Sequence, residues 1–308
     1  MKMYDVVIVG AGLAGLQCAK LLSQCGAKIL LADRKKDLTK GIHTTGIFVR
    51  KTLEDFDFPL DCLGKAVRHV TLYSPKLRPI NLTSERDEFR VGKMGKLYES
   101  FLLECLANGV EFANETRYVG AETDRAKTLV RFESGGKSWT AQTKVLIGAD
   151  GANSRVAKDL NLDENREWIV GFEEVWRGVP LEGEPSLHCF LDAKLAPGYL
   201  AWVTNDGDET HIGVGGYAAR FNPREALEIF REKIGQNVLA LAGGECVETR
   251  GGRIPVGGVL RRIANQNGLL IGDAAGAVSP LTAGGLDPCL RLSAMAANIV
   301  QGRLRTDD

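Results

Sequence analysis

The sequence offers little that could hold a metal ion or build a disulfide framework. Its seven cysteines are scattered and contain no C-x-x-C pair, so neither a disulfide-rich fold nor a zinc or iron–sulfur site is expected. There are only four histidines, and their positions show no ligand spacing. We therefore expect reduced thiols and no metal site.

An excess of charge of one sign and a long apolar run are also lacking. Lys and Arg together number 39, as do Asp and Glu, so the formal net charge is zero and no global field would attract nucleic acid. No apolar stretch approaches the ~20 residues that cross a bilayer, and the first residues predict a buried strand rather than a signal peptide. We expect a cytoplasmic protein that binds no nucleic acid and has no membrane span, with peripheral membrane contact left open.

Glycine, in contrast, is abundant, with 36 residues, and many of these gather in clusters typical of ligand loops. The first cluster, residues 10–15, follows an apolar strand over residues 4–9 and opens a helix over about residues 13–25. A second strand follows over residues 27–32. This order of strand, glycine turn, helix and strand predicts a Rossmann-like dinucleotide-binding unit.

The spacing of these first glycines fits a phosphate-binding turn. Gly10 permits a tight turn, Gly12 lets the backbone approach a pyrophosphate, and Gly15 allows close packing of helix and strand. Asp33 ends the second strand, where an acid accepts hydrogen bonds from an adenosine ribose. The residues predicted to bind a cofactor in this part of the chain are Gly10, Gly12, Ala14, Gly15, Asp33 and Arg34.

Two later strands also run into small residues and an aspartate. The pair Asp150-Gly151 follows the apolar residues 145–147, and the pair Gly272-Asp273 follows residues 268–271. Either pair alone also fits a structural turn at a strand end. Because both come after a Rossmann turn, they indicate a ligand site built from three separated segments.

These three segments resemble the FAD-binding segments of flavoproteins built like para-hydroxybenzoate hydroxylase. Within that superfamily they are most similar to the geranylgeranyl reductases, which share the pattern GDAAG-x-x-x-P-L-T and the glycine run found here between Gly272 and Gly285. The similarity extends through Gly251–Pro255 and is weaker in the rest of the chain. The resemblance implies FAD, and the lack of a well-placed His or Cys suggests that it is held without a covalent bond.

The resemblance also implies roles for individual residues. Asp273 would bind the ribityl chain of FAD, and Asp150-Gly151 would support the pyrophosphate region. Asp287-Pro288 would cap and begin a helix whose N-terminus stabilises the reduced flavin. The remaining residues implied to lie at the cofactor by this resemblance are Gly272, Pro280, Ala283, Gly284, Gly285 and Leu286.

Other positions depart from the pattern of that family or carry weaker signals. Lys93 stands where an arginine usually meets the FAD phosphates, and it offers a point charge instead of a guanidinium fork. Tyr199 and Trp202 are half of an aromatic motif of the reductases and could line a substrate pocket, although aromatic residues in strands are more often core. His43 lies in a loop near the flavin in relatives and is a candidate proton donor, with an ordinary loop histidine as the alternative.

The domain organisation predicted from these patterns is of the α/β class with an α+β insert. A discontinuous Rossmann-like FAD-binding domain would comprise residues 1–64, 92–165 and 250–308. Alternating apolar and polar residues predict an inserted antiparallel sheet for the substrate, over residues 65–91 and 166–249.

Three functions remain open at this point. The first is reduction of C=C bonds in an apolar, isoprenoid or lipid-like substrate by hydride from reduced flavin. The second is a flavin monooxygenase that hydroxylates a small aromatic substrate, and the third is an FAD-binding electron-relay protein without its own substrate. Because only one GxGxxG turn is present, the electron donor would be transiently bound NAD(P)H or reduced ferredoxin.

Overall fold

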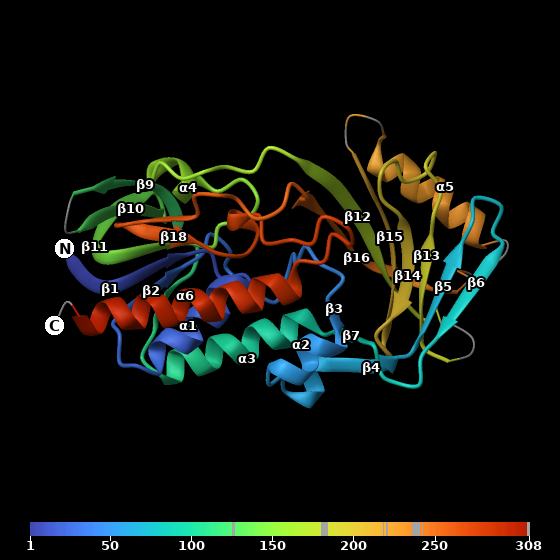
Figure 1. Cartoon of the computed structure of the whole chain (residues 1–308), viewed down its shortest axis with the longest axis horizontal. Coiled ribbons are helices and arrows are strands. Elements are labelled where there is room, and N and C mark those ends of the chain that lie inside the picture. Colours follow the sequence, from blue (N-terminus) through green and yellow to red (C-terminus); the bar gives the residue numbers. More distant parts are fainter. Residues whose placement is uncertain are drawn as a thin grey trace. The chain divides into compact units, whose positions relative to one another are not determined.

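The computed structural model describes residues 1–124, 127–179, 184–217, 219, 221–235, 241 and 243–306. The chain divides into two compact units (Figure 1). Unit 1 comprises residues 1–40, 98–167 and 255–308, and unit 2 comprises residues 41–97 and 168–254.

Unit 1 is built on an eight-stranded sheet whose central strands are parallel. The order along the sheet is β17-β18-β11-β1-β2-β8, with β10 pairing with β11 and β9 pairing with β10. The strands are β1 (Lys2–Val9), β2 (Ile29–Ala32), β8 (Glu111–Ala113), β9 (Arg117–Thr123), β10 (Thr128–Ser134), β11 (Lys137–Gly148), β17 (Ala264–Asn265) and β18 (Gly268–Leu270). The helices are α1 (Leu13–Ser23), α3 (Met94–Ala107, whose first residues belong to unit 2), α4 (Arg155–Asp159), the 3-10 turn η3 (Gly272–Ala275) and α6 (Leu286–Thr306).

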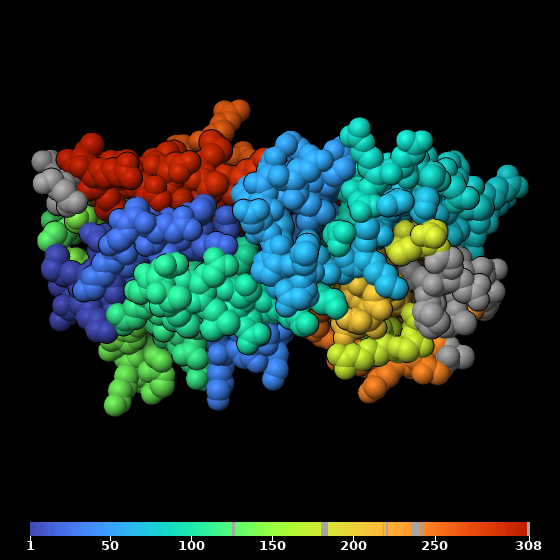
Figure 2. All heavy atoms as spheres, turned by 90° about the horizontal axis from the view of Figure 1, so that it is seen from below, coloured from blue at the N-terminus to red at the C-terminus, as the bar shows by residue number. Residues whose placement is uncertain are grey.

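The central strands are buried on both faces, as their continuous apolar sequences predict. Val7, Leu30 and Leu146 are fully buried and face a core shared with Phe132 of β10. The side chains that alternate with these along the strands, such as that of Ile8, point to the other face of the sheet. Ile8 is also fully buried. Figures 1 and 2 show α1, α3 and α6 side by side on this side of unit 1.

Unit 2 contains two sheets. The larger has seven strands in the order β16-β12-β15-β14-β13-β5-β6, and the smaller has the order β3-β7-β4. The larger sheet consists of β5 (His69–Tyr73), β6 (Pro79–Thr83), β12 (Trp168–Arg177), β13 (Ser186–Phe190), β14 (Ala201–Asn205), β15 (Glu209–Gly216) and β16 (Glu245–Pro255). The smaller sheet and the helices are β3 (Ile47–Val49), β4 (Leu63–Val67), β7 (Phe89–Gly92), α2 (Arg50–Asp55), the 3-10 turn η1 (Leu60–Cys62) and α5 (Pro223–Gly235).

The helix α5 covers one face of the larger sheet. Phe230 and Leu227 of α5 are buried against Ile212 of β15 and Val203 of β14. Because side chains alternate along a strand, Trp202 lies on the opposite face of the sheet. The residues directly before and after Ile212 in β15 lie on that same face. We call this second surface of the larger sheet the polar face, because it holds the charged groups described below.

The strand–turn–helix–strand opening and the later strands occur where the sequence predicts them, but two expectations need correction. Residues 41–64 and 92–97 lie in unit 2, because β3, β4 and β7 hydrogen-bond to one another as a separate sheet. Residues 250–254 also lie in unit 2, because they belong to β16 of the larger sheet. The larger sheet is mixed, since β5 pairs with β13 in parallel; the long connection between them lets the chain return in the same direction. No helix within the described ranges is both long and apolar enough to span a bilayer.

Candidate functional site

The first glycine turn of unit 1 leaves room for a ligand at one position only. A Cβ at Gly10 would lie 2.2 Å from the Ala149 carbonyl oxygen, and one at Gly15 would lie 1.9 Å from the Gly10 carbonyl oxygen. Gly10 also has a φ of +100°, which favours glycine. A Cβ at Gly12, in contrast, would meet nothing within 4 Å. Gly10 and Gly15 are thus required by the chain itself, whereas the space at Gly12 is open.

Asp33 holds this turn in place. Its Oδ2 accepts a hydrogen bond of 2.7 Å from the Ala11 N–H, and its Oδ1 accepts one of 2.8 Å from the Lys35 N–H. Each carboxylate oxygen retains acceptor capacity, which fits a ribose hydroxyl. Of its neighbours in the predicted site, Arg34 is exposed and Ala14 is buried in α1. The Cβ of Ala14 is the atom that lies nearest to a Cβ built on Gly272.

The side chain of Asp150 is engaged by the protein itself. It accepts hydrogen bonds from Ser154 Oγ at 2.6 Å, from Arg155 N at 2.8 Å and from Val156 N at 3.2 Å, and so holds the start of α4. Burial raises the pKa of this carboxyl in spite of those bonds. The neighbouring Gly151 has a φ of +83°, and a Cβ there would meet nothing within 4 Å. Any ligand contact at this strand end would therefore use the Gly151 backbone.

Asp273 is the most unusual carboxyl group of unit 1. Burial raises its pKa to about 6, and no compensating group contributes. Its main-chain oxygen accepts a hydrogen bond of 2.8 Å from Asn165, which also donates to the Ala152 carbonyl at 3.1 Å. Asn165 thus ties the second predicted segment to the third, and leaves the Asp273 carboxylate available to a hydroxyl donor.

The segment after Asp273 folds back toward its carboxylate. A Cβ built on Gly285 would lie 3.5 Å from Asp273 Oδ1. Ser279 closes this loop, because it accepts a hydrogen bond from Ala283 N at 2.9 Å and donates one to the Gly284 carbonyl at 3.1 Å. The tip of the loop includes the exposed Pro280. Residues 283–285 therefore form a fixed backbone edge beside a partly buried acid.

The helix that follows does not begin as the sequence suggests. α6 begins at Leu286, and the Cys289 N–H donates to the Gly285 carbonyl at 3.0 Å, so Gly285 occupies the capping position expected for Asp287. Asp287 lies inside the first turn and accepts two hydrogen bonds of 3.0 Å from Arg291 Nε, four residues on. The charge of Asp287 is thus balanced by an arginine of the same helix.

Sheet topology brings the three segments together. The register aligns Val9 of β1 with Ala32 of β2 and with Gly148 of β11, and Gly148 with Leu270 of β18. Ligands of open parallel sheets bind outside the carboxyl ends of such strands. The open turn at a helix N-terminus, Asp33 and the partly buried Asp273 fit the phosphates and hydroxyls of a dinucleotide such as FAD.

The remaining predicted site residues belong to unit 2. The ammonium group of Lys93 forms an ion pair with Asp208, so it is engaged within its own unit. His43 is exposed in the loop of residues 41–46. The rings of Tyr199 and Trp202 lie 6.4 Å apart at an angle of 68°. No group of three His, Cys, Asp or Glu side chains that could hold a metal ion occurs in the part of the chain that the structure describes.

A cluster of charged groups on the polar face of unit 2 was not predicted from the sequence. Glu173 and His211 are only 4% and 2% exposed, and His211 Nδ1 lies 3.1 Å from Glu173 Oε1. Arg250 Nη1 lies 3.5 Å from the same oxygen, and His211 Nε2 lies 3.8 Å from Asp206 Oδ2. Two carboxylates and two basic groups are thus buried together, as buried charges require.

This cluster should make the stability of the protein depend on pH. Burial alone would lower the pKa of His211, but the carboxylates of Asp206 and Glu173 outweigh burial and raise it to about 9. The stabilisation from protonated His211 is complete below the unfolded pKa of about 6.5 and is lost as the pH rises through about 9. Between those limits, we expect wild type to lose up to about 3 kcal/mol more stability than His211→Gln. Urea unfolding of both proteins across this interval measures the difference, and parallel curves would contradict the prediction.

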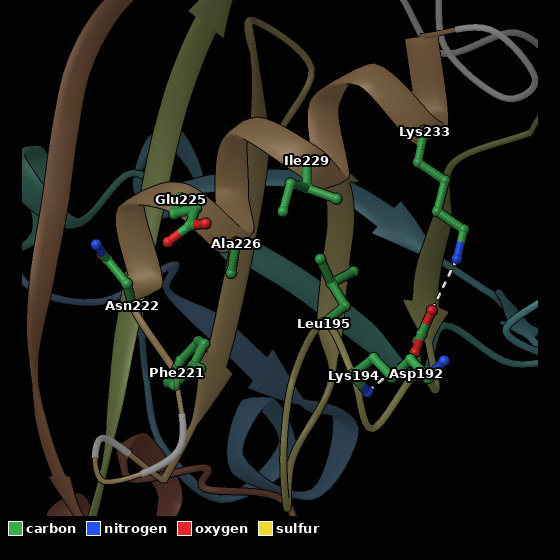
Figure 3. A pocket seen from close by; sticks show the side chains of 9 residues that line it. All are labelled: Asp192, Lys194, Leu195, Phe221, Asn222, Glu225, Ala226, Ile229 and Lys233. Atoms are coloured by element: carbon green, nitrogen blue, oxygen red, sulfur yellow. Dashed lines mark hydrogen bonds and ion pairs between the residues drawn. The ribbon is translucent and has the colours of Figure 1, made fainter.

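A groove of about 320 Å³ lies on the α5 side of unit 2, away from the polar face. Figure 3 shows Ile229 of α5 above Leu195, with Lys233 directed toward Asp192. The two charged groups form an ion pair of 2.8 Å. The groove contains none of the predicted site residues, and we do not regard it as the functional site.

The chain is similar to known families and proteins. The family described as FAD binding domain matches residues 97–290, and the pyridine nucleotide-disulphide oxidoreductase family matches residues 4–172. A digeranylgeranylglycerophospholipid reductase of Methanocaldococcus jannaschii is 26% identical over 99% of this chain and 79% of its own length.

Solved structures share the fold. A geranylgeranyl bacteriochlorophyll reductase-like protein from Thermoplasma acidophilum aligns with a TM-score of 0.90 at 20% identity, over 100% of this chain and 80% of its own. A p-nitrophenol 4-monooxygenase from Pseudomonas putida aligns with a TM-score of 0.80 at 14% identity, over 100% of this chain and 82% of its own. At these identities the structural likeness concerns the fold alone.

Proposed function

Because this chain belongs to the FAD binding domain family, we propose that it is an FAD-dependent reductase of C=C bonds in an isoprenoid, lipid-like substrate. The observation that carries the proposal is the similarity to digeranylgeranylglycerophospholipid reductases along 99% of the chain. An FAD-dependent oxidoreductase is supported by both family matches, which together span residues 4–290.

We assign FAD to the carboxyl edge of the parallel strands in unit 1. The N–H groups at the start of α1 would bind the pyrophosphate beside Gly12, and Asp33 would accept hydrogen bonds from the adenosine ribose. Asp273 would accept a hydrogen bond from the ribityl chain, and the backbone of residues 283–286 would face the pyrimidine edge of the flavin. Bound FAD would supply the hydride, and the protein groups would fix its position and local field.

Unit 2 would supply the substrate surface and the proton. Tyr199 and Trp202 offer aromatic surface on the polar face, which suits an apolar chain. His43 is our candidate proton donor, since it is exposed in a loop that approaches the flavin in the family that this sequence resembles. Transiently bound NAD(P)H or reduced ferredoxin would supply the electrons. Lys93 could meet an FAD phosphate only if it left Asp208, so its role is the least supported of these assignments.

The alternative reaction is hydroxylation of an aromatic ring, which the fold of the p-nitrophenol 4-monooxygenase makes worth testing. The reductase is favoured because the curated relatives share sequence along nearly the whole chain, whereas the monooxygenase shares the fold at 14% identity.

One experiment separates these functions. We expect the purified protein to release FAD, and not FMN, on denaturation. The dithionite-reduced protein, kept without oxygen, should then add two hydrogens per double bond to a geranylgeranyl-bearing glycerophospholipid, as measured by mass spectrometry. Oxygen uptake coupled to hydroxylation of an aromatic substrate, without alkene reduction, would favour the monooxygenase. Bound FAD with neither reaction would favour an electron relay.

A further inference from the structure

Glu173 of β12 lies at the centre of the buried cluster and joins two parts of unit 2 that carry candidate site residues. We propose that Glu173 is a positioning residue, which fastens the loop of residues 41–46 to the larger sheet and fixes the indole of Trp202. The consequence for catalysis rests on the proposed function, but the structural part of the proposal can be tested without it.

The first contact is with the loop. The hydroxyl of Thr45 donates a hydrogen bond to Glu173 Oε2. Arg250 of β16, which lies 3.5 Å from Glu173 Oε1, donates a hydrogen bond of 3.0 Å to the carbonyl oxygen of Thr44. Two successive loop residues are thus held by neighbouring charged groups of the larger sheet, just after His43.

The second contact is with the aromatic surface. Trp202 Nε1 donates a hydrogen bond of 3.0 Å to Glu173 Oε2. Gly213 of β15 pairs with Glu173 on one side and with Trp202 on the other, and a Cβ at Gly213 would lie 2.2 Å from the Trp202 ring. Because this glycine lacks a side chain, the indole can lie flat across β15 and reach the carboxylate on the next strand.

The surrounding charges make this anchor strong. A buried carboxylate is stable only when it is paired and hydrogen-bonded, and His211 and Arg250 provide the opposite charge. Although burial opposes ionisation, the hydrogen bond and charge of His211 hold the pKa of Glu173 below its usual value. A charged acceptor binds the Thr45 hydroxyl and the Trp202 indole more strongly than a neutral one would.

The residue next in sequence provides a matched control. Glu174 also lies in β12 and also accepts an indole hydrogen bond, from Trp176 Nε1 at 2.9 Å. Its carboxylate forms an ion pair of 3.2 Å with Arg231 of α5, so it points to the opposite face of the sheet. Glu174→Gln therefore removes an equivalent charge without touching the 41–46 loop.

The decisive measurement is hydrogen exchange of the 41–46 segment in the FAD-bound protein. We expect Glu173→Gln to accelerate this exchange by about tenfold, and Thr45→Val, which removes only the hydroxyl, to accelerate it by a smaller factor. Glu174→Gln should leave it unchanged. If Glu173→Gln does not fold, Thr45→Val decides, because it keeps every buried ion pair. If the folded variants at Glu173 and Thr45 exchange this segment at the wild-type rate, the proposal is overturned.

Two further readouts separate positioning from general stability. The change in tryptophan fluorescence caused by Glu173→Gln should disappear in a Trp202→Phe background, whereas that caused by Glu174→Gln should persist. Under the proposed function, kcat for alkene reduction should fall in Glu173→Gln and stay at the wild-type value in Glu174→Gln. If wild type reduces no alkene, the proposed function is wrong. The exchange measurement still decides whether Glu173 positions the loop.

Discussion

Replacement of Gly12 by valine is expected to give a folded protein that holds almost no FAD. A Cβ at this position would meet no protein atom within 4 Å, so we expect the fold to accommodate the side chain. The same space lies at the N-terminus of α1, where a pyrophosphate is expected to contact the backbone. A branched side chain there would occupy the position of the phosphates, and we expect FAD affinity to fall more than a hundredfold, on the order of 3 kcal/mol or more.

The control is the same substitution three residues later. A Cβ at Gly15 would lie 1.9 Å from the Gly10 carbonyl oxygen, so Gly15→Val should destabilise the fold itself. Flavin content and far-UV circular dichroism, measured on the same samples, distinguish the two outcomes. Gly12→Val should lose flavin and keep its helical signal, while Gly15→Val should lose both. Normal flavin content in Gly12→Val would show that the phosphates bind elsewhere.

The contrast between these glycines also shows how far the sequence determines the fold. The strand–turn–helix opening is encoded within about 30 residues, and its glycine and apolar positions are local signals. The same holds for the strands that end at Gly148 and Leu270. The resemblance to geranylgeranyl reductases, which rested on these segments, is confirmed by the curated relatives.

The features that the sequence did not predict depend on long-range pairing. Thr45 and Glu173 are 128 positions apart, and Lys93 and Asp208 are 115 positions apart. Nothing near Glu173 in sequence indicates that its carboxylate will meet a loop hydroxyl and an indole, because only the register of β12, β14 and β15 brings them together. The small sheet of β3, β4 and β7 was missed for the same reason, and its strand β3 was assigned to the FAD-binding domain although it lies in unit 2.

Asp273 is the second residue for which we expect a large effect, and here stability and cofactor binding should change in opposite directions. Partial burial raises its pKa to about 6, so the folded chain without cofactor carries an unfavourable charge on a partly buried side chain at neutral pH. The rise of the pKa from its ordinary value of 3.8 corresponds to about 3 kcal/mol at most. This cost is absent below about pH 4 and is fully present above about pH 6, because the folded-state pKa is raised.

Asp273→Asn should remove that cost and also the charged acceptor for a ribityl hydroxyl. We expect the cofactor-free variant to unfold at a higher temperature than cofactor-free wild type at neutral pH, since the buried group is now neutral. Its affinity for FAD should fall by about tenfold to a hundredfold, because hydrogen bonds to charged groups contribute about 1.5–3 kcal/mol. Thermal unfolding and flavin titration of the cofactor-free proteins measure the two effects separately.

The dependence of binding on pH tests whether the carboxylate of Asp273 is the group responsible. A hydroxyl that donates to this carboxylate stabilises its charged form, so bound FAD should lower the pKa of Asp273 from about 6. By linkage, wild-type affinity should weaken as the pH falls through about 6, whereas the affinity of Asp273→Asn should stay level over the same interval. Asp150 is also a partly buried acid with a raised pKa, but it is present in both proteins and its effect cancels in the comparison. If both proteins show the same pH profile, FAD does not bind through the carboxylate of Asp273.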